Sequence, residues 1–556
     1  MTAVVGRRAL AAIVALLVLA GCAGIPLDGP VRSVDVGTDE GGGDLVTIAE
    51  GPLPGATPEQ LINGFLTAQR APARDYSIAR DFLTEEFRTT WSPTSGVLIT
   101  SGAVPPTSSS ENSFALSVNV VAVVNSTGNY RELQRAESQQ LEYRLELDSE
   151  GEWRIAEAPQ GTVLSASQFA STFAPYPLYF YEPLGRYLVP DVRWFPATAS
   201  RANRIVTELL RGQSPWYANG VLVTAFPADT KLDQGVQIAG GTASVDLSNI
   251  VAGASRAEQF RMQQQLVASL ALSDVSNVQI TVGGLPLDIG TGEVPEWVLS
   301  VPSGVVGDVD GAFGAVSGAG VQRLPGISDR VISLDLTGAT IARGGAAAAV
   351  RTPQGVWSLP QAQDNAILID TRPGLTDPSI DGLGYIWSAQ SSPADSIIAF
   401  GPDGTPHAIP APYLDGSIVS LDVSRDGARL LIAAQGSDGP TVVMVGVLRD
   451  GAGVPVALGE PLELTIGSRP LVDATWVDAS TIATLSTSAS ATNVDLYRIG
   501  GRHESFGSLQ NGVQIVGGNM VEGLRVRDID GRVWRHSSSG GWQATALVVS
   551  FLATQQ

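Results

Sequence analysis

The pattern of hydrophobic and polar positions changes along the chain and divides it into three regions. From about residue 49 to 175, apolar residues first recur at helical spacing after Thr57-Pro58-Glu59-Gln60, a motif typical of a capped helix start. Apolar and polar residues then alternate over 114–124 and 141–147, as in strands. Helices followed by an antiparallel sheet with one solvent-facing side predict an α+β domain.

The second region, from about residue 176 to 296, mixes helical and strand periods. Its predicted elements are a helix over 202–210 that ends at Gly212, strands over 243–247 and 278–282, a turn at Gly283-Gly284, and a helix opened by the capping box Ser255–Glu258. The second of these helices carries the apolar residues Phe260, Val267 and Leu270. We therefore expect a second α+β domain.

The third region, residues 305–556, is rich in strand patterns and nearly free of helical stripes. Aspartate–glycine pairs between apolar runs are a strong hairpin signal, and they recur at Asp403-Gly404, Asp426-Gly427, Asp450-Gly451 and Asp530-Gly531. The segment 421–433 resembles a propeller blade, with a strand, a turn and a strand. A blade takes about 40–45 residues, so five or six would fit, with the number left open. An array of two-sheet sandwiches is the alternative.

The N-terminus has the pattern of an export signal. Arg7 and Arg8 precede an apolar run over 9–21, which is too short to span a bilayer comfortably. The run ends in Leu19-Ala20-Gly21-Cys22, which resembles a bacterial lipobox. We therefore expect a signal peptide over 1–21, an S-diacylglycerol group and an N-acyl chain (palmitate) on Cys22, and a Gly- and Pro-rich tether over 22–48.

Composition narrows the possible functions. The 556 residues carry a formal net charge of −21, which is the opposite of what a phosphate backbone or an anionic lipid surface attracts. Nucleic-acid binding is therefore not expected. The chain has 1 cysteine, Cys22, so it forms no intramolecular disulfide. With 44% apolar and 16% charged residues, the chain has enough apolar residues to form the hydrophobic cores of several domains.

The sequence contains no recognisable set of catalytic residues. The three histidines, His407, His503 and His536, lack metal-ligand spacing, and we expect no metal, no cofactor and no enzymatic activity. We interpret His407 and His536 as loop or strand-edge residues. The turn aspartates Asp403, Asp426, Asp450 and Asp530 are interpreted as acceptors for local backbone N–H groups. Carboxylate pairs for glycan cleavage stay an open alternative, since the chain holds 55 acidic residues.

Several segments carry a family resemblance. Glu208–Gly212, Thr224–Thr230 and Ala243–Ser248 resemble a GerMN domain. The first region, with its helices followed by an antiparallel sheet, resembles the curved cone of the NTF2-like fold. Together with the order of lipobox, α+β cone and propeller, the opening segments Gly51–Glu59 and Asn63–Leu66 resemble the LpqB lipoproteins of actinobacteria. The resemblance covers essentially the whole mature chain. It implies an accessory protein that is anchored to the extracytoplasmic face of the cell membrane and engages the extracytoplasmic part of an MtrB-like sensor histidine kinase, influencing envelope homeostasis and division.

The alternative function is cell-wall glycan binding without catalysis. It depends on aromatic side chains stacking on sugars, and the propeller region offers Trp357, Trp387, Trp476, Trp534 and Trp542. The favoured interpretation of the same residues is that they are packing groups within blades. The two interpretations differ in whether these indoles face solvent.

Overall fold

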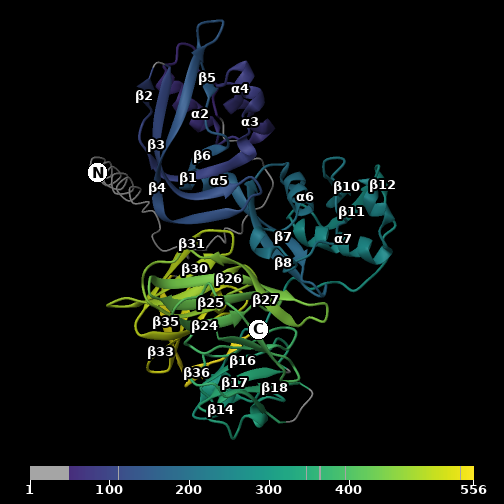
Figure 1. Cartoon of the computed structure of the whole chain (residues 1–556), viewed down its shortest axis with the longest axis vertical. Coiled ribbons are helices and arrows are strands. Elements are labelled where there is room, and N and C mark those ends of the chain that lie inside the picture. Colours follow the sequence, from purple (N-terminus) through teal and green to yellow (C-terminus); the bar gives the residue numbers. More distant parts are fainter. Residues whose placement is uncertain (1–48, 111, 346, 362–364, 395, 539) are drawn as a thin grey trace, which may run out of the picture. The chain divides into compact units, whose positions relative to one another are not determined.

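The computed structural model describes residues 49–556, apart from residues 111, 346, 362–364, 395 and 539. The first body begins with helices α2 (Pro58–Ala68), α3 (Ala73–Arg80) and α4 (Glu85–Thr90). A sheet in the order β5-β4-β3-β1-β6 follows, with β2 paired to β3. The strands are β1 (Gly96–Ala103), β2 (Thr107–Ser110), β3 (Ser113–Asn125), β4 (Tyr130–Leu147), β5 (Trp153–Glu157) and β6 (Thr162–Ser165). This is the α+β arrangement that the sequence predicts (Figure 1).

Local sequence signals explain how the first body begins. Thr57 accepts a hydrogen bond from the backbone N–H of Gln60, whose side chain in turn accepts from the backbone N–H of Thr57. This confirms the predicted capping box. Leu61, Ile62 and Phe65 on the inner side of α2 are buried against strands β3, β4 and β5.

The entry to α3 is strained. Arg74, Asp75 and Tyr76 have φ values of 51°, 54° and 58°, in the left-handed region that disfavours residues with a Cβ. Each such residue costs about 1–2 kcal/mol relative to a right-handed conformation. The packing of Tyr76, which is 3% exposed, must hold this segment in place.

The second body combines a long hairpin with a small sheet. Its elements are β7 (Phe173–Tyr181), β8 (Leu188–Pro196), α6 (Arg201–Arg211), β9 (Gln237–Ala239), β10 (Thr242–Asp246), α7 (Arg256–Ser269), β11 (Asn277–Val282) and β12 (Leu285–Pro286). Helix α5 (Ala166–Thr172) precedes them and packs on β1 and β6 of the first body. The sheet order is β12-β11-β10-β9, with β10 and β11 parallel. The predicted capping box at Ser255–Glu258 and the turn at Gly283-Gly284, where both φ values are positive, are confirmed.

The third body is a β-propeller with six sheets among the described residues. Its strands are β13 (Val305–Val309), β14 (Ala312–Ser317), β15 (Gly320–Gln322), β16 (Gly338–Ile341), β17 (Ala348–Thr352), β18 (Gly355–Leu359), β19 (Ile367–Asp370), β20 (Ser379–Ile380), β21 (Ile386–Ser388), β22 (Ile397–Phe400), β23 (Pro406–Ile409), β24 (Ser417–Val423), β25 (Arg429–Gly436), β26 (Gly439–Arg449), β27 (Pro455–Glu463), β28 (Leu471–Trp476), β29 (Thr481–Thr487), β30 (Thr492–Arg498), β31 (His503–Leu509), β32 (Gly512–Val516), β33 (Arg525–Asp528), β34 (Arg532–His536), β35 (Trp542–Val548), β36 (Phe551–Leu552) and β37 (Thr554–Gln555). The sandwich alternative is therefore wrong.

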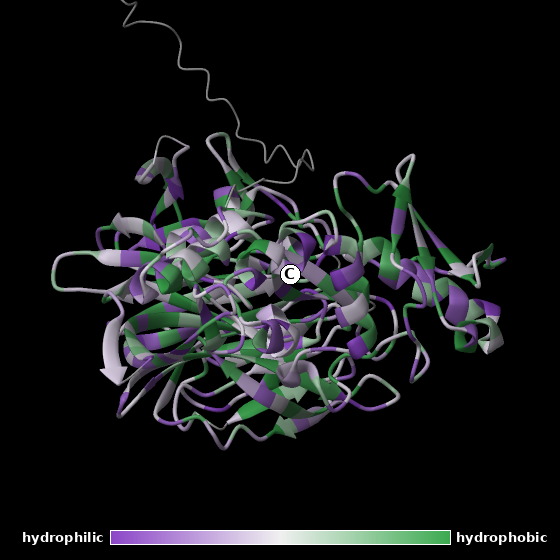
Figure 2. Ribbon diagram, turned by 90° about the horizontal axis from the view of Figure 1, so that it is seen from above, coloured by the Kyte–Doolittle hydropathy of each residue, from purple (hydrophilic) through white to green (hydrophobic). Residues whose placement is uncertain are grey.

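The propeller closes through its last strands. The inner strands contact one another in the cyclic order β16, β20, β24, β28, β32 and β36. Strand β36 pairs with β13 and so completes the first sheet with residues from the far end of the region. Strand β37 pairs in parallel with β16 of the next sheet. Hydrophobic (green) and hydrophilic (purple) segments both occur along the chain (Figure 2), and strands such as β25 are buried on both sides because they lie between neighbouring sheets.

Short 3-10 helices connect several of these elements. They are η1 (Pro93–Ser95), η2 (Pro215–Tyr217), η3 (Asn249–Gly253), η4 (Ser328–Arg330) and η5 (Val521–Gly523). Val221, next to η2, packs in one hydrophobic core with Leu178 of β7 and Leu431 of β25. The second body and the propeller thus share buried apolar surface.

Candidate functional site

A buried ion pair lies on strand β8. The guanidinium of Arg193 donates from Nη2 to Oδ2 of Asp191 at 2.7 Å, and the exposed fractions of the two residues are 1% and 0%. Because strand residues at positions i and i+2 share a face, the two side chains project together from β8. Two charges removed from water are tolerated only when further hydrogen bonds surround them.

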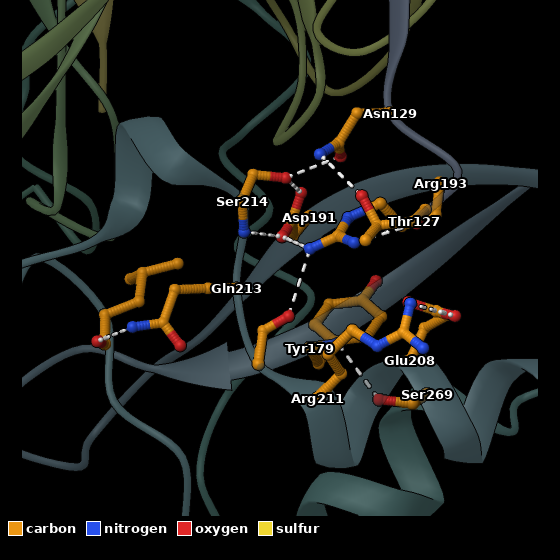
Figure 3. A network of polar contacts seen from close by, with 12 residues as sticks. Thr127, Asn129, Tyr179, Asp191, Arg193, Glu208, Arg211, Gln213, Ser214 and Ser269 are labelled. Carbon is orange, nitrogen blue, oxygen red and sulfur yellow. Dashed lines mark hydrogen bonds and ion pairs between the residues drawn. The ribbon is translucent and has the colours of Figure 1, made fainter. Parts of the chain in front are cut away.

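Those further hydrogen bonds join the first and second bodies (Figure 3). The backbone N–H of Ser214 donates to Asp191 Oδ2 at 2.7 Å, and its hydroxyl lies 2.6 Å from Asp191 Oδ1 and 2.7 Å from the side-chain amide of Asn129. Arg193 donates to the carbonyl of Thr127 at 2.9 Å and to that of Gly212 at 3.1 Å. The loop between β3 and β4 is therefore fixed to β8 by charge-assisted hydrogen bonds.

A second buried carboxylate lies near this joint. Glu208 of α6 is fully buried and lies 3.2 Å from Arg204 and 3.1 Å from Arg211. Two arginines share one carboxylate, so this cluster on α6 carries an excess of positive charge. In the sequence, Glu208 stands out only as part of the GerMN-like motif, and Asp191 and Arg193 were not predicted as site residues. The signal that could have found them is a pair of opposite charges inside the apolar run 188–195.

A cavity lined largely by polar residues lies at the centre of the propeller. The cavity measures about 280 Å³ and is lined by the inner strands. Asp422 of β24 accepts hydrogen bonds from Ser379 of β20 and from Thr475 of β28, both at 3.0 Å. The amide of Gln556 also donates to Asp422. Asp422 thus joins three neighbouring sheets.

Asp473 of β28 likewise links its own sheet to the next one in the ring, which begins with β32. Its carboxylate accepts hydrogen bonds from the backbone N–H of Ile515 in β32, at 2.8 Å, and from that of Ala474, at 2.9 Å. Burial raises the pKa of Asp422 to about 6 and that of Asp473 to about 7, because charged carboxylates lose hydration there. Both carboxyls stabilise the ring by cross-sheet hydrogen bonds.

The predicted turn aspartates are confirmed in three cases. Asp403, Asp426 and Asp450 each accept a hydrogen bond from the backbone N–H two residues later. In the fourth turn the prediction was wrong, because Asp528 and not Asp530 accepts the N–H groups of Asp530 and Arg532. The side chain that closes this hairpin is the one at the end of β33, which faces back over the turn.

The tryptophan candidates are packing residues. Every one of the five indole N–H groups donates to an acceptor within the propeller, with acceptors on Thr352, Asp381, Asp422, Asp528 and Phe506 for Trp357, Trp387, Trp476, Trp534 and Trp542 respectively. Trp387 is 0% exposed, and Trp476 and Trp542 are also buried. In three sheets the acceptor is the Asp or Thr that opens the hairpin of the same indole. Their positions favour blade packing over sugar stacking.

The histidines lie on separate strands. His407 is half-buried on the edge strand β23, and His536 of β34 stacks on Phe506 with ring centroids 3.9 Å apart. His503, on the edge strand β31, contacts Glu132 of the first body at 2.8 Å. Within residues 49–556, leaving aside the seven undescribed positions, no group of three or more His, Cys, Asp or Glu side chains is arranged to hold a metal ion.

The lipidation site lies elsewhere. Cys22, with the signal peptide and tether expected around it, lies outside the described residues. The helices of the described part of the chain lack the length and hydrophobicity that crossing a bilayer requires.

Comparisons with known families match the three bodies separately. Residues 51–170 match the N-terminal domain of lipoprotein LpqB, residues 177–288 match the sporulation and spore germination (Germane) domain, and residues 311–550 match the LpqB β-propeller domain. The first GerMN domain of GerM from Bacillus subtilis is 26% identical over 22% of this chain and 93% of that one, with a TM-score of 0.19. TolB from Acinetobacter baumannii is 14% identical over 38% of this chain and 55% of that one, with a TM-score of 0.30.

Whole-chain relatives share one name. Lipoprotein LpqB of Cutibacterium acnes is 27% identical over 77% of this chain and 77% of its own length. Lipoprotein LpqB of Thermobifida fusca is 26% identical over 84% of this chain and 85% of its own length. Since both LpqB-specific domains are matched, with a Germane domain between them, and the relatives align over most of their length, the chain belongs to the LpqB family of lipoproteins.

Proposed function

We propose that this protein is a lipid-anchored accessory protein on the extracytoplasmic face of the cell membrane that binds and modulates a two-component sensor kinase of the MtrB type. Its activity would be that of a binding and regulatory module and not that of an enzyme. Through the kinase it would influence envelope homeostasis and division. Membership in the LpqB family supports the lipid anchor, and the family resemblance supports the partner.

The observation that carries the proposal is the buried polar joint at Asp191. Asp191, Arg193, Ser214 and Asn129 fix the first body to the second, and the second body shares a hydrophobic core with the propeller. A joint of this kind suits a protein that presents surfaces from several domains to one partner in a fixed relation.

The prominent carboxylates are consistent with this role. The turn aspartates hold hairpins, and Asp422 and Asp473 hold neighbouring sheets together. These groups are engaged in folding, so a binding function needs no further chemistry from them. The tryptophans that glycan binding would use are engaged in the same way.

Co-purification from detergent-solubilised membranes tests the proposal. We expect a sensor kinase to co-purify with the wild-type chain and to be lost or reduced with Cys22→Ala, because the anchor holds both proteins at one surface. Fusing an unrelated membrane-spanning segment to Cys22→Ala is the matched control and should restore the kinase.

Two results would contradict the proposal. If the kinase is absent from wild-type samples, the partner is wrong. If wall polymer is enriched in its place, glycan binding becomes the better function. Isolated kinase ectodomain should also bind the soluble chain directly, which separates contact from co-localisation.

A further inference from the structure

An apolar cavity of about 210 Å³ lies between the first body and β8 of the second. Its walls include Val97 and Val124 of the first sheet, Phe173 of β7, and Trp194 and Phe195 of β8. An apolar cavity of about 150 Å³ in another protein holds benzene, so this one has room for a ligand of that size or larger.

Tyr76 places a polar group in the wall of this cavity. The residue is 3% exposed, and its hydroxyl makes no hydrogen bond with any described residue. Burial raises the pKa of Tyr76, so the hydroxyl stays protonated and can donate. In a largely apolar wall, this hydroxyl is available to donate to a ligand that carries an acceptor.

The backbone at Tyr76 adds an independent observation. Tyr76 is the last of three consecutive residues in the left-handed region, and the first two are Arg74 and Asp75. Strain of this kind persists where surrounding structure enforces it, and it often accompanies binding sites. Here it holds Tyr76 against the cavity in place of a regular helical start.

Charged residues at the rim of the cavity determine which charge a ligand should carry. Arg201 and Arg204 line the cavity, together with the single carboxylate of Asp75, which pairs with Arg80 at 2.7 Å. Arg201 lies 2.7 Å from Asp274, whereas Arg204 shares Glu208 with another arginine. The rim therefore carries an excess of positive charge. Burial lowers the pKa of Arg204, so an anion beside it would stabilise its charged form.

We propose that this cavity binds a small carboxylate with an apolar aromatic or acyl body, whose head group accepts a hydrogen bond from Tyr76 and faces Arg204. The apolar body lies among the aromatic side chains of β7 and β8. The inference does not rest on the proposed kinase partner.

Ligand binding here would act on the joint between the bodies. Asn125 and Gly128 line the cavity, and the same loop carries Thr127 and Asn129, which bind Arg193 and Ser214. A ligand that contacts both sides stabilises the joined arrangement, by mass action, over any in which the bodies separate. The site is thus placed to couple a small molecule to the relation between two domains.

Isothermal titration calorimetry of the mature chain with 4-phenylbutyrate tests the proposal. We expect saturable binding at one site, binding of acetate too weak to detect because it lacks the apolar body, and at least about tenfold weaker binding of 4-phenylbutan-1-ol, which lacks the charge. Tyr76→Phe should weaken the binding of 4-phenylbutyrate about tenfold, because it deletes one charge-assisted hydrogen bond. Tyr143→Phe, which changes a buried tyrosine of the same body that does not line the cavity, is the matched control and should leave affinity unchanged.

A blocking variant provides a second readout. Thr94 is exposed at the cavity rim, so Thr94→Trp should fill the mouth without disturbing the core and should abolish binding. Circular dichroism and the thermal midpoint check that each variant folds. The proposal is overturned if neither Tyr76→Phe nor Thr94→Trp changes the affinity for 4-phenylbutyrate. It is also overturned if 4-phenylbutyrate and 4-phenylbutan-1-ol bind equally well, or if the dissociation constant of the wild-type chain for 4-phenylbutyrate exceeds about 10 mM.

Discussion

Nδ1 of His503 lies 2.8 Å from Oε2 of Glu132, and the backbone N–H of His503 donates to the same oxygen at 3.1 Å. The two residues are 371 positions apart, one on β4 of the first body and the other on the edge strand β31 of the propeller. An edge strand offers unpaired N–H groups, and here one of them is used by a carboxylate from another domain.

This contact should depend on pH. The hydrogen bond to Glu132 raises the pKa of His503 above its usual 6.5, so the folded state favours the protonated ring. The contribution to stability is complete below about pH 6.5 and is lost as pH rises through the folded-state pKa. We expect His503→Gln to lower the thermal midpoint at about pH 5.5 and to change it little at about pH 8.5. His407→Gln, on the edge strand of another sheet, is the control; equal shifts at both pH values would show that protonation is not involved.

The carboxyls of Asp422 and Asp473, at the centre of the propeller, predict that stability also falls as pH rises. Because the pKa values of Asp422 and Asp473 are raised to about 6 and about 7, the folded state binds more protons than the unfolded state above about pH 4. Their contribution to stability is complete below the unfolded-state pKa and is lost as pH rises through about 6 to 7. Asp473→Asn, which mimics the protonated form, should therefore flatten the decline in the free energy of unfolding between about pH 5 and 8. Exposed Asp438→Asn should leave the slope as it is; an unchanged slope in Asp473→Asn would refute the assignment.

The joint between the first two bodies should be sensitive to the loss of one charge. Asp191→Asn leaves the buried guanidinium of Arg193 without its counter-ion and should cost about 3–5 kcal/mol, measured by urea unfolding. Asp288→Asn removes the partner of an exposed arginine, Arg256, and should cost less than about 1 kcal/mol. Limited proteolysis should also cleave the Asp191→Asn chain faster around residues 125–130. Similar losses in the two variants would mean that the buried pair does not hold the joint.

The tryptophans of the propeller should behave as core residues. Trp387→Ala removes a fully buried indole and the donor to Asp381, so we expect a loss of about 3–5 kcal/mol. Half-buried Trp357→Ala should cost less, since part of its ring already faces water. Tryptophan fluorescence of the wild-type chain should stay unchanged when soluble cell-wall fragments are added. A saturable change in that emission would revive sugar stacking.

The sequence by itself determined the features that depend on neighbours along the chain. The Thr57 capping box, the Gly283-Gly284 turn and the aspartates of three hairpins follow from contacts across a few residues, so residue type and spacing suffice to predict them. The order of the three domains also follows from sequence, because each has its own period of burial and its own family motifs.

Tertiary structure decided what depends on partners far along the chain. Periodicity places Phe260 and Val267 on the apolar side of α7, but both are only half-buried, and Met262 and Leu266 face the core, because the packing partners choose the face. The ring of six sheets closes because β36 returns to pair with β13. Asp191 and Arg193 are tolerated in an apolar strand because Ser214 and Asn129 arrive from other elements. A one-dimensional pattern reports how much each position is buried, whereas the identity of its partner is fixed only when distant segments meet.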